Sequence, residues 1–209
     1  MEQIQIRRHG HACFSVTCRD YTVVFDPYAD GSVPGYPALR LTADQVLCSH
    51  EHHDHNAREH VALRAGRTSP FTLTELATFH DDRRGALRGP NTIRILEACG
   101  LRVAHFGDLG CTDLTPEQEA ALTGLDAAMI PVGGFFTIGP AEAKALADRL
   151  RPRVLIPMHY REGGVGLPMI AELSDFLKLA GPCVRCAEAT FTLTAQTAPQ
   201  IAVLPVSSQ

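Results

Sequence analysis

The sequence predicts a single-domain α+β protein in which strands and helices pack in layers. The chain has 209 residues, and 45% of its residues are apolar, which suits one domain with a substantial core. Strand-like segments dominate the first half, whereas strands alternate with helical segments in the second half. No repeat, low-complexity tract or linker interrupts this pattern, so we expect one domain over residues 1–209.

The strands are predicted from short segments that are β-branched or alternate between polar and apolar residues. Two glycines and two prolines mark Asp30–Pro37 as a loop, and Gly100 lies between two segments that resemble a hairpin. The predicted strands are Gln3–Arg7, Ala12–Thr17, Thr22–Phe25, Gln45–Cys48, Thr72–Thr78, Thr92–Ala98, Arg102–Phe106, Asp126–Ile130, Val154–Pro157, Phe191–Leu193 and Ile201–Val206.

The helices are predicted from capping residues and from apolar spacing. Thr115 is a typical N-cap residue, and Pro116 and an acidic residue follow it in the first turn. The predicted helices are Pro116–Leu122, Pro140–Leu150, Leu167–Leu179 and the short segment Asn56–Ala65.

Composition and charge argue against several classes of function. The formal net charge of -4 does not favour nucleic-acid binding. The start of the chain does not resemble a signal peptide, and the most apolar window, Ala127–Ile138, is too short to span a membrane. We therefore expect a cytoplasmic protein that binds neither nucleic acid nor membrane. The sequence sets no oligomeric state.

The cysteines are predicted to be reduced thiols. Their number, 7, is odd, and most of them lie in apolar runs. Cys183 and Cys186 form a lone CxxC, whereas a structural zinc site would need two more ligands nearby. We therefore assign no metal or redox role to this pair.

Four histidines lie within six residues directly after a predicted strand, in the run His50-Glu51-His52-His53-Asp54-His55. His50 and His52 are alternate residues and can converge on one ion, while Asp54 and His55 can address a second ion. Imidazole and carboxylate groups suit zinc, manganese or iron. The alternative is a solvated polar turn, but the HxHxDH spacing is a specific motif rather than mere histidine enrichment.

The HxHxDH run resembles the signature of the metallo-β-lactamase superfamily. Within it, the chain resembles the branch that contains ascorbate-6-phosphate lactonase and related metal-dependent hydrolases. Motifs along most of the chain carry this resemblance: Gly10-His11, Asp26-Pro27, Phe79-His80-Asp81, Gly89-Pro90-Asn91-Thr92, Gly107-Asp108-Leu109-Gly110, Pro131-Val132-Gly133-Gly134 and Pro157-Met158-His159-Tyr160.

The resemblance implies a four-layer αββα sandwich with two divalent metal ions per chain at one edge of the sheets. Carried over by position, His50, His52 and His80 would hold the first metal. Asp54, His55 and His159 would hold the second, and Asp108 would bridge both. Zinc is the default because imidazole ligands dominate, with manganese or iron as alternatives.

Two further residues are expected to support these ligands. Asp26 would hold the histidine loop through hydrogen bonds, although an ordinary Asp-Pro turn is an equal alternative. His11 could also face the site, although a buried histidine with satisfied hydrogen bonds is the more common case. We assign no ligand role to His9, His60 and His105, and His53 is expected to face away.

The implied reaction is hydrolysis by a metal-bridging hydroxide that attacks an ester, lactone, amide or phosphoester, with Asp54 as a catalytic residue that orients the nucleophile or carries a proton. Arg83, Arg84 and Arg88 could receive an anionic group, or they could be a solvated charge run. The residues expected to bind a small-molecule substrate are Arg88, Asn91 and Gly134.

Two other functions remain as alternatives. One is a nucleic-acid-processing phosphodiesterase of the same superfamily, but such relatives carry extra substrate-gripping parts, and this chain is acidic. The other is a metal-dependent redox or sensor protein, which in this superfamily would replace some histidines with acids and add a flavin domain. Neither change is visible, so a hydrolase acting on a small molecule is the leading hypothesis.

Overall fold

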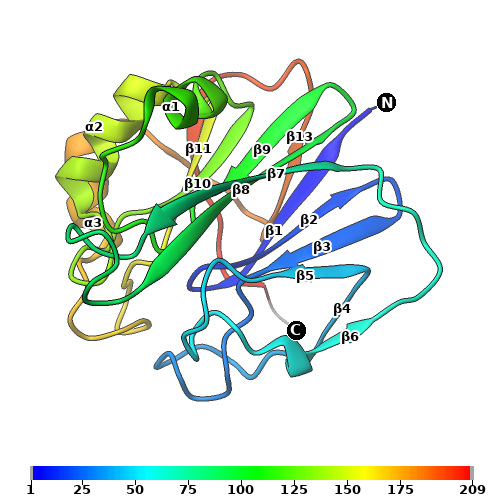
Figure 1. Cartoon of the computed structure of the whole chain (residues 1–209), viewed down its shortest axis with the longest axis horizontal. Helices are drawn as coiled ribbons and strands as arrows, with labels where there is room; N and C mark the ends of the chain where they lie inside the picture. Colours follow the sequence, from blue (N-terminus) through cyan, green and yellow to red (C-terminus); the bar gives the residue numbers. More distant parts are fainter. Residues whose placement is uncertain (1, 208–209) are drawn as a thin grey trace.

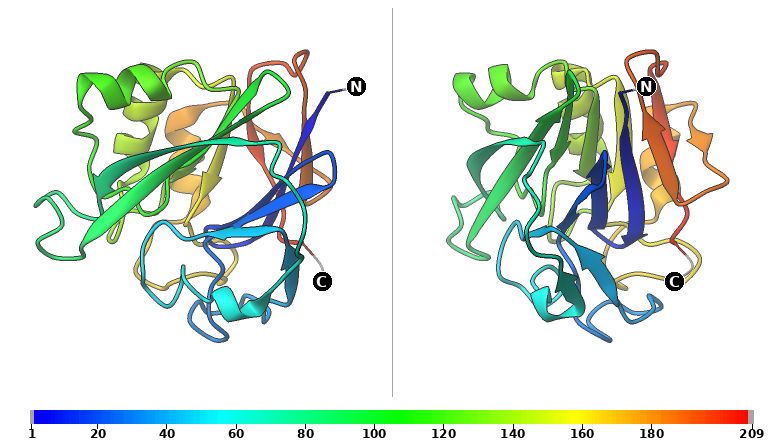
Figure 2. Two further views of the ribbon diagram at one scale, coloured as in Figure 1. Left: turned by 45° about the vertical axis from the view of Figure 1, so that its right-hand side comes forward. Right: turned by 90° about the vertical axis from the view of Figure 1, so that its right-hand side faces the viewer.

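Two β-sheets face each other across the core, and the α-helices lie on the far side of the second sheet (Figures 1 and 2). The structure is a computed structural model that describes residues 2–207. Most buried apolar side chains form one continuous core between and around the sheets. Among the described residues, no helix has the length and apolar character needed to cross a membrane.

The first sheet has five strands in the order β13-β1-β2-β3-β5. β1, β2 and β3 form an antiparallel meander, β5 pairs parallel with β3, and β13 pairs antiparallel with β1. Ile4 and Ile6 are fully buried, whereas Gln5 and Arg7 lie on the outer face, as the two-residue period of a strand requires. The bounds are β1 (Ile4–Gly10), β2 (Cys13–Cys18), β3 (Tyr21–Phe25), β5 (Gln45–Leu47) and β13 (Thr190–Leu193).

The second sheet has seven strands in the order β12-β14-β11-β10-β9-β8-β7. The strands from β12 to β9 are parallel, and the pairs β9–β8 and β8–β7 are antiparallel. β10 and β11 are buried along their whole length because both faces are covered. The bounds are β7 (Thr72–Phe79), β8 (Pro90–Ala98), β9 (Leu101–His105), β10 (Ala127–Pro131), β11 (Val154–Met158), β12 (Val184–Arg185) and β14 (Gln200–Val203).

The three α-helices among residues 2–207 differ at their N-termini: the first has a side-chain N-cap, and the third has none. α1 (Pro116–Leu122) starts with a capping box in which Thr115 and Gln118 exchange hydrogen bonds. α2 (Pro140–Leu150) turns Ala143, Leu146 and Leu150 towards the core. α3 (Leu173–Ala180) packs beside α2. All three lie on the same side of the second sheet (Figure 1).

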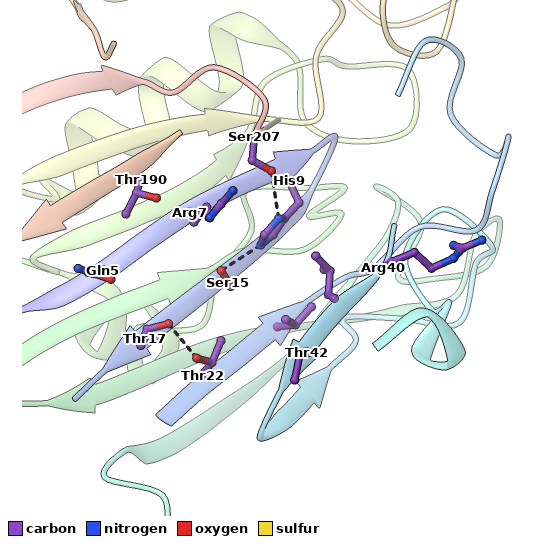
Figure 3. Close-up of a pocket in the computed structure, with 12 residues that line it drawn as sticks. Gln5, Arg7, His9, Ser15, Thr17, Thr22, Arg40, Thr42, Thr190 and Ser207 are labelled. Atoms are coloured by element: carbon purple, nitrogen blue, oxygen red, sulfur yellow. Dashed lines mark hydrogen bonds between the residues drawn. The ribbon is translucent and has the colours of Figure 1, made fainter. Parts of the chain in front are cut away.

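A segment without an α-helix covers one end of the outer face of the first sheet. It contains η1 (Arg58–His60) and a two-stranded sheet of β4 (Leu41–Ala43) and β6 (Val61–Leu63). A small second core lies beneath it. The rest of this face is a polar groove of about 400 Å³, where Ser15, Thr17 and Thr22 project from β2 and β3 (Figure 3).

The layered single-domain fold with two sheets that the sequence predicts is confirmed, and most predicted strands lie within two residues of their observed bounds. The outermost layer differs: within residues 2–207, the first sheet carries the segment just described instead of an α-helix. The predicted helix Asn56–Ala65 is wrong, because only Arg58–His60 is helical and Val61–Leu63 pairs with β4. The helix predicted from Leu167 starts at Leu173, because the backbone amide of Ala171 donates to Gly133 instead.

The segments that follow β10 and β11 pack closely, which leads to a prediction. A Cβ atom at Gly133 would lie 2.1 Å from the carbonyl oxygen of His159, whereas one at Gly139 would meet only ordinary contacts, the nearest at 3.6 Å. We expect Gly133→Ala to lower the free energy of unfolding by about 1–3 kcal/mol or more. Gly139→Ala should cost less than about 1 kcal/mol, the effect of losing glycine at a helix N-cap. Urea denaturation of both variants measures this, and equal losses would contradict it.

Candidate metal centre

The candidate ligands come together at one edge of the sandwich, although they are spread over more than a hundred residues of sequence. They follow the ends of β5, β7, β9 and β11, which are labelled in Figure 1. One further histidine lies in the turn between β1 and β2. The ends of neighbouring strands meet at a common edge, which is where layered α/β proteins place their ligands. The contributing residues are His50, His52, Asp54 and His55 after β5, His80 after β7, Asp108 after β9, His159 after β11 and His11 in the β1–β2 turn.

One group consists of His50, His52 and His80, which are the three residues expected to hold the first metal. Each offers a ring nitrogen, and these nitrogens lie within 4.8 Å of one another. The ring centroids of His50 and His52 are 4.6 Å apart, as are those of His50 and His80. His50 and His80 are buried, whereas His52 is exposed and opens the group to solvent.

A second group consists of Asp54, His55 and His159, the residues expected to hold the second metal, together with His11. Their ligand atoms also lie within 4.8 Å of one another. The three histidines have no exposed surface, and the side chain of Asp54 is 22% exposed. The rings of His55 and His159 are nearly parallel, with centroids 5.7 Å apart.

Asp108 lies between the two groups. Its Oδ2 atom is 3.3 Å from Nε2 of His80 in the first group and 3.2 Å from Nε2 of His159 in the second. Nε2 of His55 is 3.3 Å from the same oxygen. Burial by itself would raise the pKa of Asp108, but His159 and His55 hold that pKa well below its usual range. A carboxylate in this position could be a shared ligand of metal ions held by the two groups.

The chemistry of these donors fits divalent metal ions. Nε2 of His50, His55 and His159 is buried and has no hydrogen-bond partner among residues 2–207. Unpaired buried nitrogens are costly unless something binds them. Burial lowers the pKa of His50 to about 3, so its imidazole is neutral and keeps the lone pair that a metal needs.

Asp26 contacts a histidine of the second group directly and a histidine of the first group through Ser49. It follows β3, is fully buried, and its Oδ2 accepts a hydrogen bond from Nδ1 of His55 at 2.8 Å. The same carboxylate accepts bonds from the backbone amide and the hydroxyl of Ser49, both at 2.6 Å, and the Ser49 hydroxyl lies 2.9 Å from Nδ1 of His50. Burial alone would raise the pKa of Asp26, but His105 and His55 lower it to about 2. Asp26 is therefore more than a turn residue.

Ser49 is a supporting residue that the sequence analysis missed. Its position directly before the first histidine of the run is the signal that could have found it, because a hydroxyl there can reach both the strand end and the ligand.

Asn91 does not line the cavity where it was expected to bind substrate. Its side chain is buried, and its amide group donates to Thr78 at 2.8 Å and to the carbonyl of Phe106 at 3.0 Å. Its Oδ1 accepts from the backbone amide of Asp108 at 2.9 Å. All of its polar atoms are therefore engaged within the protein, so Asn91 positions the loop of Asp108 and does not face the substrate cavity.

A cavity of about 470 Å³ opens onto both groups of ligands. Four candidate ligands line it, namely His52, Asp54, His80 and Asp108. The other lining residues are Arg88, Phe136, Leu167, Ser32, Glu51 and His53. His53 lies at the cavity wall, but no group of ligand atoms among residues 2–207 includes it.

Of the three arginines after His80, Arg88 alone lines this cavity within the described residues. Its guanidinium carbon lies 5.5 Å from the centre of the Phe136 ring. Gly134 does not line the cavity, because its backbone bonds to Ile138 in a tight turn that instead presents Phe136.

The loop that carries Arg88 is held by Asp81. The carboxylate of Asp81 is buried and accepts four backbone hydrogen bonds of 2.8–2.9 Å, from Arg83, Gly85, Leu87 and Arg88. Although burial opposes it, these donors lower the pKa of Asp81 to about 2. The base of the Arg88 side chain therefore has a fixed place at the cavity.

The remaining histidines and the cysteines lie outside both groups. His105 donates from Nε2 to the carbonyl of Ala12 and accepts at Nδ1 from the backbone amide of Gly107, and its ring stacks on Phe25 with centroids 4.9 Å apart. His60 lies 3.4 Å from Asp30. All cysteines are free thiols, and no metal-ligating group among residues 2–207 contains one.

Comparisons with known proteins point to one family. A model of the β-lactamase superfamily domain matches residues 5–159, a range that includes every candidate ligand. A crystal structure from Thermotoga maritima, described as a candidate Zn-dependent hydrolase of the metallo-β-lactamase superfamily, is 32% identical and has a TM-score of 0.73. The match covers 96% of this chain and 98% of the Thermotoga maritima chain.

Two relatives named UPF0173 metal-dependent hydrolase are similar over most of their length. The protein from Thermococcus onnurineus is 27% identical over 216 residues, covering 85% of this chain and 92% of the relative. The protein from Desulfitobacterium hafniense is 29% identical over 227 residues, covering 87% of this chain and 94% of the relative.

The contacts of Asp26 yield a prediction. Asp26→Asn keeps the shape of the side chain but removes the charge that orients His55 and, through Ser49, His50. We expect it to lower metal affinity about 10–100-fold without unfolding the chain. Asp44→Asn is a matched control, because Asp44 is a buried carboxylate that binds Thr22 and Arg64 instead. Competition titrations with a chelator would measure both, and wild-type affinity in Asp26→Asn would refute the role.

Proposed function

Since the chain belongs to the metallo-β-lactamase superfamily and is a metal-dependent hydrolase, we propose that it uses two divalent ions per chain to hydrolyse a small ester, lactone or phosphorylated substrate. The position of Asp108 carries this proposal. Its Oδ2 lies 3.2–3.3 Å from ring nitrogens of both groups of histidines, as a shared ligand requires.

The residues divide into two sets of ligands around that shared carboxylate. His50, His52 and His80 would hold the first ion, and Asp54, His55 and His159 the second. When bound, such ions lower the pKa of a water molecule and stabilise negative charge on a reacting oxygen. Zinc suits the imidazole-rich set, and manganese and iron are the alternatives.

Asp54 combines access to the cavity with a permanent negative charge. Its side chain is partly exposed at the cavity wall. Burial would raise its pKa, but His55 and His11 hold that pKa far below the usual range. An acid that remains ionised can accept a hydrogen bond from an attacking water, but it is a poor proton carrier. Of its two expected catalytic roles, orienting the nucleophile is therefore favoured.

Arg88 defines the substrate end of the cavity. Its guanidinium can bind a phosphate or carboxylate in bidentate fashion, while Phe136 and Leu167 offer apolar surface beside it. A substrate with an anionic group at one end and a hydrolysable bond at the other would span the cavity. The resemblance to ascorbate-6-phosphate lactonase makes a phosphorylated lactone the first compound to test.

The proposed stoichiometry can be tested by metal loading. Protein stripped with chelator and reloaded with Zn²⁺, Mn²⁺ or Fe²⁺ should bind two ions per chain. His50→Ala and His159→Ala should each weaken mainly one of them, whereas His60→Ala should bind both, because His60 lies outside both groups. Elemental analysis with titration would measure this. Saturation at one ion that Asp108→Ala leaves unchanged would refute the dinuclear centre.

The role of Arg88 can be tested with a matched pair of lactones, one with a phosphate and one without. Wild type should prefer the phosphorylated compound, and Arg88→Ala should lose about 10- to 100-fold in kcat/KM for it alone. This range follows from about 1.5–3 kcal/mol for a hydrogen bond to a charged group. Arg83→Ala is the control, because Arg83 is exposed and away from the cavity wall. Equal rates of wild type on both lactones would exclude an anionic-group site.

A further inference from the structure

His11 lies in a turn that holds it in an unusual backbone conformation. It follows Gly10 between β1 and β2, with φ of 138° at Gly10 and 50° at His11. Only glycine fits at position 10, because a Cβ atom there would lie 2.6 Å from the Tyr36 ring. The carbonyl of His11 accepts a hydrogen bond of 3.3 Å from the backbone amide of His159. Left-handed conformations of larger residues often occur at functional sites, where the surrounding structure maintains them.

The ring of His11 lies as close to Asp54 as the ring of the predicted ligand His55 does. Nε2 of His11 lies 3.5 Å from Oδ2 of Asp54, and Nε2 of His55 lies 3.6 Å from the same oxygen. The ring centroids of His11 and His159 are 4.0 Å apart. Two imidazoles thus approach the same carboxylate oxygen, and the ligand atom of His159 lies within 4.8 Å of theirs.

Neither ring nitrogen of His11 has a hydrogen-bond partner in the part of the chain that the structure describes, although the residue is fully buried. Its separation from Asp54 is too long for a hydrogen bond of normal strength. His9, two residues earlier, shows the ordinary case: it is also buried, but Ser15 and Ser207 contact its nitrogens at 3.0 and 3.3 Å.

We propose that His11 is a ligand of the second metal ion, in addition to Asp54, His55, His159 and the shared Asp108. This inference rests on the proposed function. The second position would then have five protein donors, whereas the first has three imidazoles and the shared carboxylate. Zinc sites in proteins are usually four-coordinate, and catalytic ones keep a position open. The ion at the second position should therefore have a higher coordination number than the ion at the first.

Cobalt substitution tests this proposal without relying on activity, because the visible absorption of Co²⁺ weakens as its coordination number rises. His11→Gly removes the ring and suits the left-handed turn, and His9→Ala is the matched control. We expect His11→Gly to bind one Co²⁺ at wild-type affinity and the other at least about 10-fold more weakly, with stronger visible absorption. Added imidazole should reverse both changes. His9→Ala should match wild type.

Two results would overturn the proposal. One is a His11→Gly protein with wild-type affinities and spectrum. The other is a loss of affinity with an unchanged spectrum, which would make His11 a positioning residue for Asp54. Circular dichroism of the metal-free variants checks that the turn still folds. A wild-type protein that takes up one Co²⁺ would instead refute the dinuclear centre, and the spectrum of that ion in His11→Gly would still decide the role of His11.

Discussion

The buried carboxylate of Asp26 is the interaction on which the geometry of the centre depends. It lies at the end of β3 and fixes the loop after β5 through three hydrogen bonds, two to Ser49 and one to His55. A buried charge is tolerated only where it is well paired, so the loop cannot move away from the strand end without a large cost in free energy. The Ser49 hydroxyl also contacts Nδ1 of His50. A single carboxylate therefore sets ring orientations in both groups of ligands.

Much of the fold and the centre could be predicted because the relevant signals are local. The HxHxDH spacing and the cap and proline of α1 depend on neighbours in sequence, and the structure confirms the helix Pro116–Leu122. The errors occur where distant segments decide the outcome. Val61–Leu63 becomes a strand because β4 offers a partner, and neither strand carries a signal of its own. The structure brings the predicted ligands together, but their roles as ligands remain predictions.

The direction of a side chain was the least predictable property of the site. Asn91 is close in sequence to the loop that carries Arg88, but strand pairing between β7 and β8 turns its amide towards Thr78 and the loop of Asp108. His11 could be read as an ordinary buried histidine, and its missing hydrogen bonds are visible only once its neighbours are placed. The sequence identifies which residue types are available for chemistry, whereas the pairing of distant strands decides which of them meet.

The pairing of β1 with β13 has a consequence for synthesis of the protein on the ribosome. Ile4 pairs with Leu193, so the outer edge of β1 stays without its native partner until nearly the whole chain has emerged. At about 5–20 residues per second, this interval is roughly 10–40 s. All candidate ligands, up to His159, are made before β13. Arg7 and Arg8 place positive charge on β1 during this interval. Charged side chains on an edge strand discourage its pairing with a strand of another nascent chain.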